Sequence, residues 1–98
     1  MDIQSIFTEL GLPKNKGVVY LAALEIGSGS VYHIATKARL PRTTVHEILG
    51  QLASLGLVSF VVKGRTRIYT AEPPTKLKHI IQEKERLLES ALPEINSH

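Results

Sequence analysis

The sequence contains no cysteine and no long apolar run. Without cysteine, the chain can form neither disulfide bonds nor thiolate metal sites, and we expect it in a reducing compartment, the cytoplasm. The longest uncharged stretch, residues 48–62, includes polar and glycine positions and is shorter than the roughly 20 apolar residues that span a bilayer. The first residues also lack the basic segment and apolar core of a signal peptide. We therefore expect a soluble protein with no membrane partner.

Motifs for catalysis and cofactor binding are also missing. The sequence has no glycine-rich phosphate loop and no nucleophile elbow. The histidines lack zinc-ligand spacing, and neither a cysteine nor an acidic cluster accompanies them; they are His33, His46, His79 and His98. We therefore expect no enzymatic activity, no metal and no cofactor.

What remains is a chain of ordinary globular composition. Its 98 residues are 43% hydrophobic and 21% charged, close to the average of globular domains. A chain of this length forms one core rather than two. It also buries a modest fraction of its surface, so we expect a partner subunit to contribute to its stability.

Positive charge is concentrated in the middle of the chain. Residues 12–71 carry eight lysine and arginine side chains but only two glutamates, Glu25 and Glu47, which gives a net charge of +6. The two flanks together carry −3. This distribution indicates an anionic partner for the central segment.

Apolar spacing predicts four helices before a β-hairpin. Residues spaced three and four apart place the helices at 2–10, 13–26, about 30–38 and 41–55. In the second helix, the predicted inward stripe is Val18, Leu21, Ala22 and Ile26. The sequence GSGS before the third helix is expected to form a turn.

A change of pattern at Leu57 predicts the hairpin. Residues 57–62 are β-branched and aromatic, Lys63-Gly64-Arg65 provides a turn, and residues 66–71 resume the strand pattern. Two prolines, Pro73 and Pro74, then introduce a last helix of about 18 residues that is expected to end near Pro93.

The last helix has an apolar seam with coiled-coil spacing. The seam consists of Leu77, Ile81, Lys84, Leu88 and Ala91, widened by Ile80 and Leu87. A small helical core can hardly cover the whole length of this helix, so we favour pairing with a second copy through Leu77, Ile81, Leu88 and Ala91. The alternative is that the stripe docks on the first helix of its own chain.

Three successive helices followed by a hairpin, with only two or three residues between the third and fourth predicted helices, are typical of a winged helix-turn-helix protein. The predicted fold class is mainly α with a small β-hairpin, a winged helix-turn-helix followed by a C-terminal dimerisation helix. We assign residues 1–73 to the DNA-binding domain and residues 74–98 to the dimerisation element.

The fourth helix has the composition of a DNA-reading helix. With its apolar stripe turned inward, the outward side chains are Thr43, His46, Glu47, Gly50 and Ser54, with Arg42 at the edge of the first turn. None of them is bulky and apolar, which suits a major groove about 12 Å wide. Glycine disfavours a helix by about 1 kcal/mol relative to alanine, so Gly50 either permits close approach to a DNA backbone or is merely tolerated.

The hairpin turn carries three cations. Lys63, Arg65 and Arg67 lie within five residues and have no acidic neighbour. Isolated surface charges usually serve only solvation, but a cluster beside a reader helix favours contact with DNA phosphates.

Three stretches carry a more specific signal: LGLPKNKGVVYLAALEIG, LPRTTVHEILGQLASLGLVS and KGRTRIYTAEPP. Together they resemble the winged-helix domain of the TrmB-like transcriptional regulators over roughly residues 9–76. The resemblance implies that Arg42, Thr43, Thr44 and His46 stand where the family's recognition helix reads DNA, and that residues 63–67 form its wing. It also implies dimeric regulators, commonly with a C-terminal domain that binds sugars or other effectors.

The sequence departs from the family pattern in two places. KNKG at residues 14–17 replaces an acidic or mixed stretch and an alanine, and His46 replaces the usual aromatic residue. DNA specificity is therefore not transferred from the family. The 98 residues hold no counterpart of the effector domain, so no small-molecule effector is inferred.

These observations predict a homodimeric transcriptional regulator that binds specific double-stranded DNA. Residues 41–55 would lie in the major groove, and residues 63–67 would lie on the backbone. The alternative is a winged helix that binds another protein, with weak and sequence-independent affinity for duplex DNA. RNA binding ranks third, because Tyr32, Phe60 and Tyr69 show no recognisable spacing of a stacking platform.

Overall fold

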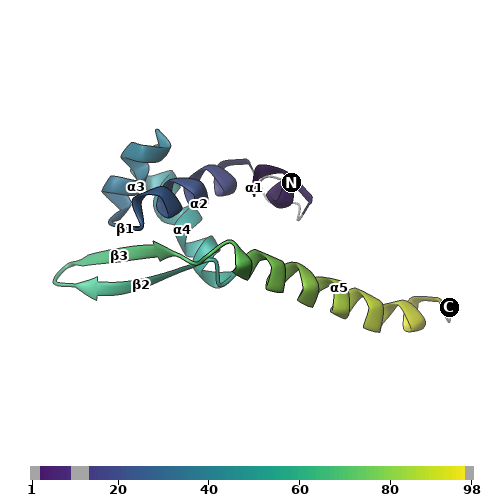
Figure 1. Ribbon diagram of the computed structural model, residues 1–98. Helices are drawn as coiled ribbons and strands as arrows, with labels where there is room; N and C mark the ends of the chain where they lie inside the picture. Colours follow the sequence, from purple (N-terminus) through teal and green to yellow (C-terminus); the bar gives the residue numbers. More distant parts are fainter. Residues whose placement is uncertain (1–2, 10–13, 97–98) are drawn as a thin grey trace.

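The computed structural model describes residues 3–9 and 14–96 of the chain. In chain order the elements are α1 (Ile3–Glu9), α2 (Lys14–Ile26), β1 (Ser28–Gly29), α3 (Val31–Ala38), α4 (Arg42–Ser54), β2 (Val58–Lys63), β3 (Thr66–Ala71) and α5 (Thr75–Asn96). This order confirms the predicted fold class, mainly α with a hairpin (Figure 1). The predicted start of the first helix at residue 2, its predicted end at residue 10 and the predicted start of the second helix at residue 13 lie outside the described residues.

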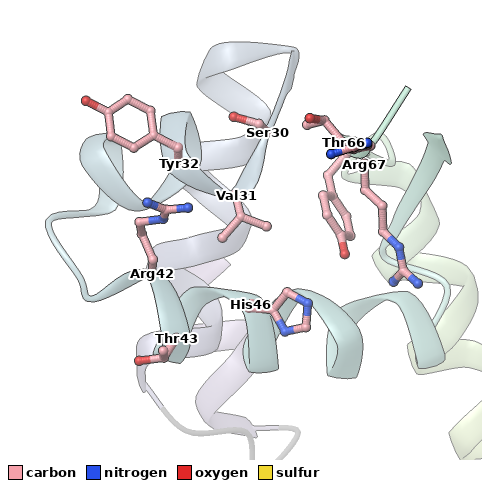
Figure 2. A pocket seen from close by; sticks show the side chains of 10 residues that line it. Ser30, Val31, Tyr32, Arg42, Thr43, His46, Thr66 and Arg67 are labelled. Carbon is pink, nitrogen blue, oxygen red and sulfur yellow. The ribbon is translucent and has the colours of Figure 1, made fainter. Parts of the chain in front are cut away.

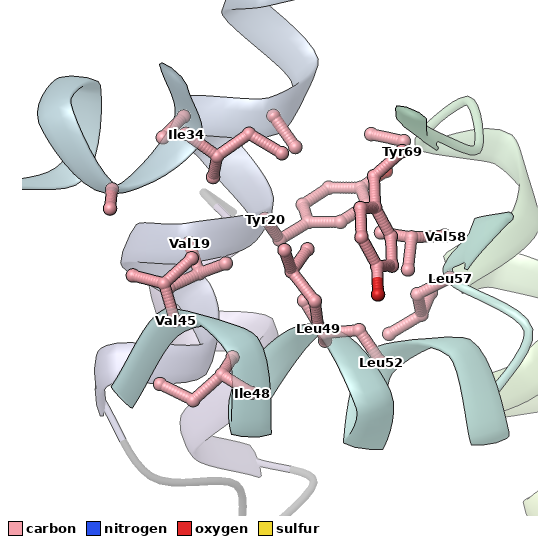
Figure 3. Packing of buried hydrophobic residues seen from close by; sticks show 14 of the residues in the cluster. Val19, Tyr20, Ile34, Val45, Ile48, Leu49, Leu52, Leu57, Val58 and Tyr69 are labelled. Carbon is pink, nitrogen blue, oxygen red and sulfur yellow. The ribbon is translucent and has the colours of Figure 1, made fainter. Parts of the chain in front are cut away.

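The core lies between α2, α3, α4 and the base of the hairpin (Figure 3). The apolar stripe of α4 turns inward as expected: Val45, Ile48, Leu49 and Leu52 are each at most 7% exposed, and its last member, Leu55, is half-buried against the core. Burial of an aliphatic side chain of this size stabilises the fold by about 1.5–3 kcal/mol. One face of α4 is thereby anchored, and its opposite face is left to solvent.

The inward face of α2 differs from the prediction. Val19, Tyr20 and Ala23 are at most 1% exposed, whereas Val18 and Leu21 are only half-buried. Of the predicted stripe, Ala22 is buried and Ile26 packs against the core, so the prediction was wrong for Val18 and Leu21. The reason is that α2 packs against α1, α3, α4 and β3. A helix that is surrounded on several sides is apolar on several sides, and its sequence period does not single out one face.

Ser30 marks the start of α3, and Gly56 follows the end of α4. The Ser30 side chain caps α3 by accepting a hydrogen bond from the His33 N–H at 3.3 Å. At the end of α4, the Leu57 N–H donates to the Leu52 carbonyl at 2.9 Å. Gly56 has φ +79, the left-handed conformation that such a helix end requires and that glycine adopts without steric penalty. The predicted ends at these positions are confirmed.

The sheet has a third strand that the sequence did not predict. Ser28 and Gly29 were expected to lie in a turn, but they form β1 and pair antiparallel with Thr70 and Tyr69 of β3. The strand order is β1-β3-β2. A Cβ on buried Gly29 would lie 3.1 Å from the Ile26 side chain, so only glycine fits here without displacing a neighbour.

Tyr20 ties the helical layer to the end of the hairpin. Its hydroxyl donates a hydrogen bond to the Glu72 carbonyl at 2.6 Å. Its ring lies 5.7 Å from the ring of Phe7 on α1. The Tyr20 side chain therefore joins α1, α2 and the segment after β3. In this way it helps to set the position of the β2–β3 hairpin relative to α4.

Helix α5 is longer than predicted. It has 22 residues, including Pro93, where the sequence pattern placed its end. Proline lacks the N–H that would bond the carbonyl four residues earlier, so the helix continues through this position with one hydrogen bond fewer. Figure 1 shows α5 projecting away from the winged domain, and the chain extends over 53 × 25 × 23 Å.

Candidate nucleic-acid interface

A groove of about 1010 Å³ lies between the start of α3, the outer face of α4 and the wing. The wing is the hairpin β2–β3 with its turn. The residues that line the groove are Ser30, Val31, Tyr32, Arg42, Thr43, His46, Arg65, Thr66, Arg67 and Tyr69. Figure 2 shows His46 projecting from α4 into this space and Arg67 pointing from the wing toward α4. Side chains from three separate segments therefore share one concave surface.

The N-terminal half of α4 presents its polar side chains to this groove. Arg42, Thr43 and His46 are exposed, whereas Thr44 is half-buried and does not line the groove. Pro41 occupies the N-cap and provides no side-chain hydrogen bond to the first turn, which contains no acidic residue. The positive end of the helix dipole is therefore open to an anion.

Gly50 lies on the same outer face of α4. It is exposed, and a Cβ added there would meet no atom within 4 Å. Packing within the chain therefore does not require a glycine at this position. The open surface is compatible with both explanations, close approach of an external partner and a glycine that is merely tolerated.

The wing ends in a two-residue turn of Gly64 and Arg65. Lys63 pairs with Thr66, and Gly64 has φ +62, as the first residue of a type II′ turn requires. Lys63, Arg65 and Arg67 are all exposed. Arg65 and Arg67 line the groove, whereas Lys63 does not.

Two arginines of the groove lie over exposed aromatic rings. The Arg42 guanidinium is 5.7 Å from the centre of the Tyr32 ring. The Arg67 guanidinium is 4.5 Å from the centre of the Phe60 ring. Such cation–π contacts contribute about 0.5–1 kcal/mol at exposed sites, enough to favour one arrangement of a side chain that would otherwise be mobile.

The charge of the groove is of one sign. Three arginines line it, and none of its lining residues is acidic. The ion pairs found in the described part of the chain lie elsewhere, between α2 and α3 and within α5. Cations without carboxylate partners inside a concave surface attract a polyanion.

Sequence reasoning identified most of this surface but missed part of it. Five predicted residues come together in the groove, namely Arg42, Thr43, His46, Arg65 and Arg67, while Thr44 and Lys63 stand beside it. The missed residues include Ser30, Tyr32 and Thr66. The start of α3 was recognised as a helix start, but no local pattern indicates that it faces the wing.

The seam predicted on α5 divides into two parts. Leu77 is 2% exposed and belongs to the core of its own chain. This corrects its assignment to a dimer contact, because the first turn of α5 follows β3 so closely that it packs back onto the core. Ile81 and Ala91 are half-buried, and Leu88 is 58% exposed. Leu87 is 54% exposed beside it, so the uncovered apolar surface begins further along α5.

Within residues 3–9 and 14–96, no three His, Asp or Glu side chains gather where they could hold a metal ion. None of the helices in these ranges is long and apolar enough to cross a membrane.

One relative is similar to this chain in sequence, and two solved structures are similar to it in fold. TrmBL1 of Pyrococcus furiosus, an HTH-type sugar sensing transcriptional regulator, is 30% identical over 82 residues, which cover 84% of this chain and 24% of TrmBL1. The archaeal chromatin protein TrmBL2 superimposes with a TM-score of 0.84 at 18% identity, over 97% of this chain and 36% of TrmBL2. A possible transcriptional regulator from Methanosarcina mazei superimposes with a TM-score of 0.79 at 14% identity, over 99% of this chain and 88% of that protein.

The structural likenesses establish the winged-helix fold, and the sequence matches establish the family. This chain spans about a quarter of the length of TrmBL1 and about a third of TrmBL2. Residues 7–75, more than half of the chain, match the family described as sugar-specific transcriptional regulator TrmB. The chain therefore belongs to the TrmB family of transcriptional regulators.

Proposed function

We propose that this chain is a sequence-specific double-stranded DNA-binding transcriptional regulator. The observation that carries the proposal is the groove in which Arg42, Thr43 and His46 of α4 face Arg65 and Arg67 of the wing with no acidic side chain among the lining residues. A helix that offers short polar groups, flanked by a cationic hairpin, matches the two ways in which proteins contact a duplex, at base edges and at phosphates.

In this proposal α4 lies in the major groove. Thr43 and His46 are exposed near its N-terminus, the end from which helix-turn-helix proteins mainly contact bases. A hydroxyl and an imidazole can each donate or accept a hydrogen bond at a base edge. The open surface around Gly50 allows the middle of α4 to approach the DNA backbone closely.

The wing binds the backbone beside that groove. Lys63, Arg65 and Arg67 are exposed on or next to its turn. Contacts from such cations to phosphates supply affinity that is independent of sequence and falls as salt rises. The wing therefore determines how tightly the duplex is held, while α4 determines which duplex is preferred.

The regulator acts as a homodimer held together by α5. Leu87 and Leu88 are more than half exposed on a helix that projects from the domain, and a second copy of α5 would cover them. A two-fold dimer places its reader helices about 34–36 Å apart or a multiple of that distance. The bound sequence is then palindromic, and the dimer works in the cytoplasm.

The test is a competition between specific and scrambled duplexes. The site is first obtained by in-vitro selection, and Thr43→Ala and His46→Ala are then compared with the wild type. Each variant should lose about 1–3 kcal/mol of preference for the selected site per good base contact removed. Affinity for scrambled DNA and the thermal midpoint should stay nearly unchanged. Gln51→Ala, on an exposed position of α4 that does not line the groove, serves as the matched control.

One result would remove α4 from the role of reader. If both variants keep the wild-type ratio of specific to scrambled affinity, base recognition does not come from this face. Weak, sequence-independent binding by the wild type would then favour a winged helix that contacts another protein.

A further inference from the structure

Arg42 is the last member of a chain of contacts that starts at the cap of α3. The Ser30 hydroxyl lies 3.0 Å from Nδ1 of His33. The His33 ring meets the Tyr32 ring edge-on, with centroids 5.6 Å apart and an interplanar angle of 71°. The Tyr32 ring in turn lies under the Arg42 guanidinium at 5.7 Å. Figure 2 shows the Arg42 side chain extending from α4 toward Tyr32 on α3.

The hydrophobic core does not account for the position of this tyrosine. Tyr32 is 56% exposed, one of the most exposed large hydrophobic side chains in the described part of the chain. Its backbone carbonyl accepts a hydrogen bond from the Thr36 hydroxyl at 2.9 Å. Within the described residues, the Tyr32 ring makes an aromatic contact with His33 and a cation–π contact with Arg42.

We infer that Tyr32 is a positioning residue that holds the Arg42 guanidinium in place for bidentate recognition of a guanine. This inference rests on the proposed function. An exposed arginine samples many rotamers, and DNA binding must select one of them. Stacking on Tyr32 selects among those rotamers before DNA arrives, so less conformational entropy is lost on binding.

A base contact fits this arrangement better than a phosphate contact. The guanidinium is a planar fork that matches the O6 and N7 atoms of guanine only in a defined orientation. A phosphate accepts a cation from many directions, and a mobile side chain serves it well. Arg42 also lies in the first turn of α4, next to Thr43, where base contacts of this fold are made.

The experiment is a double-mutant cycle on the DNA-bound dimer. In-vitro selection with the wild type and with Arg42→Ala first identifies the base pair whose preference depends on Arg42. The preference for that base pair is then measured by competition for the wild type, Tyr32→Leu, Arg42→Ala and the double variant. We expect Tyr32→Leu to lower the preference about two- to five-fold, the size of an exposed cation–π contact, when Arg42 is present. On the Arg42→Ala background it should have no further effect.

Further variants separate positioning from direct contact. Tyr32→Phe keeps the ring and should keep the preference, and Arg42→Lys keeps the charge but should lose it. Arg65→Ala should leave this preference unchanged, because Arg65 is on the wing. The loss of preference caused by Tyr32→Leu should therefore be the same with and without Arg65→Ala. In the free protein, the Arg42 side-chain proton resonances should show a ring-current shift that disappears in Tyr32→Leu. This signal is read without DNA.

The results distinguish a failure of the inference about Tyr32 from a failure of the proposed function. A preference that survives Tyr32→Leu, or losses that add in the double variant, would overturn this inference alone. A Tyr32→Phe variant as impaired as Tyr32→Leu would assign the effect to the hydroxyl and overturn it as well. If the wild type shows no preference for its selected site, the proposed function fails, and this inference fails with it.

Discussion

The hydrogen bond from Tyr20 to Glu72 allows a quantitative test of how the helical layer supports the wing. Tyr20→Phe removes the hydroxyl and leaves the buried ring in place. The bond is 2.6 Å long and joins residues 52 apart in sequence. Loss of a partner from a buried carbonyl costs about 1–3 kcal/mol. Since Glu72 is only half-buried, water can partly replace the hydroxyl, and we expect a loss of about 1 kcal/mol.

The assay is thermal and urea unfolding followed by circular dichroism. A loss of about 1 kcal/mol lowers the midpoint by roughly 4–8 °C in a domain of this size. Tyr32→Phe is the matched control, because Tyr32 is 56% exposed and its hydroxyl should contribute little to the free energy of unfolding. Equal midpoints for Tyr20→Phe and the wild type would refute the idea that this bond supports the fold.

The stabilisation that the Tyr20 hydroxyl provides should depend on pH, and the same variant tests this. Burial raises the pKa of Tyr20 above its ordinary value of 10.0, and the nearby Glu72 carboxylate raises it further. Because the pKa is higher in the folded state, the stabilisation is fully present below the unfolded value and is lost as pH rises through the folded value. The difference between wild type and Tyr20→Phe in free energy of unfolding should therefore shrink above pH 10. A difference that stays constant or grows with alkaline pH would contradict this assignment.

Three further predictions concern the wing, the dimer and the sheet. Arg65→Ala and Arg67→Ala should weaken binding to all duplexes similarly and reduce the log–log salt slope by up to about 0.9 per lost phosphate contact in each chain; an unchanged slope would place the wing away from DNA. Replacing Leu87 and Leu88 by glutamine should convert the dimer to a monomer of similar helix content, and a dimeric mass in sedimentation would exclude this surface. Gly29→Ala should lower the thermal midpoint, because the new methyl group would lie 3.1 Å from an isoleucine side chain.

The reader helix and the wing were predictable from the sequence because each depends on local periodicity. The stripe of Val45, Leu49 and Leu52 faces the core as expected, which places Thr43 and His46 outside. The wing follows from a β-branched run and the turn around Gly64. In α4 the pattern and the structure agree because a single face of the helix is buried. In the wing they agree because strand propensity and a glycine turn act locally.

Other features of the site depend on residues far apart in sequence. Strand β1 is only Ser28–Gly29, and its hydrogen-bonding partners are in β3, so no local pattern indicates a strand. The contact between Tyr32 and Arg42 exists only because α3 and α4 meet at the angle set by their shared core. The same holds for Arg67, whose approach to α4 depends on where the wing is anchored.

By itself, the sequence determined which segments are helical, where the hairpin turns and which face of α4 is polar. These properties depend on the spacing of apolar residues and on glycine in left-handed conformations, and both act over a few residues. The tertiary structure alone decided that Leu77 joins the core while Leu88 remains exposed, although both lie on one seam. Burial is a property of what packs against a helix, and α5 leaves the domain after its first turns, so equal positions in the pattern have different neighbours.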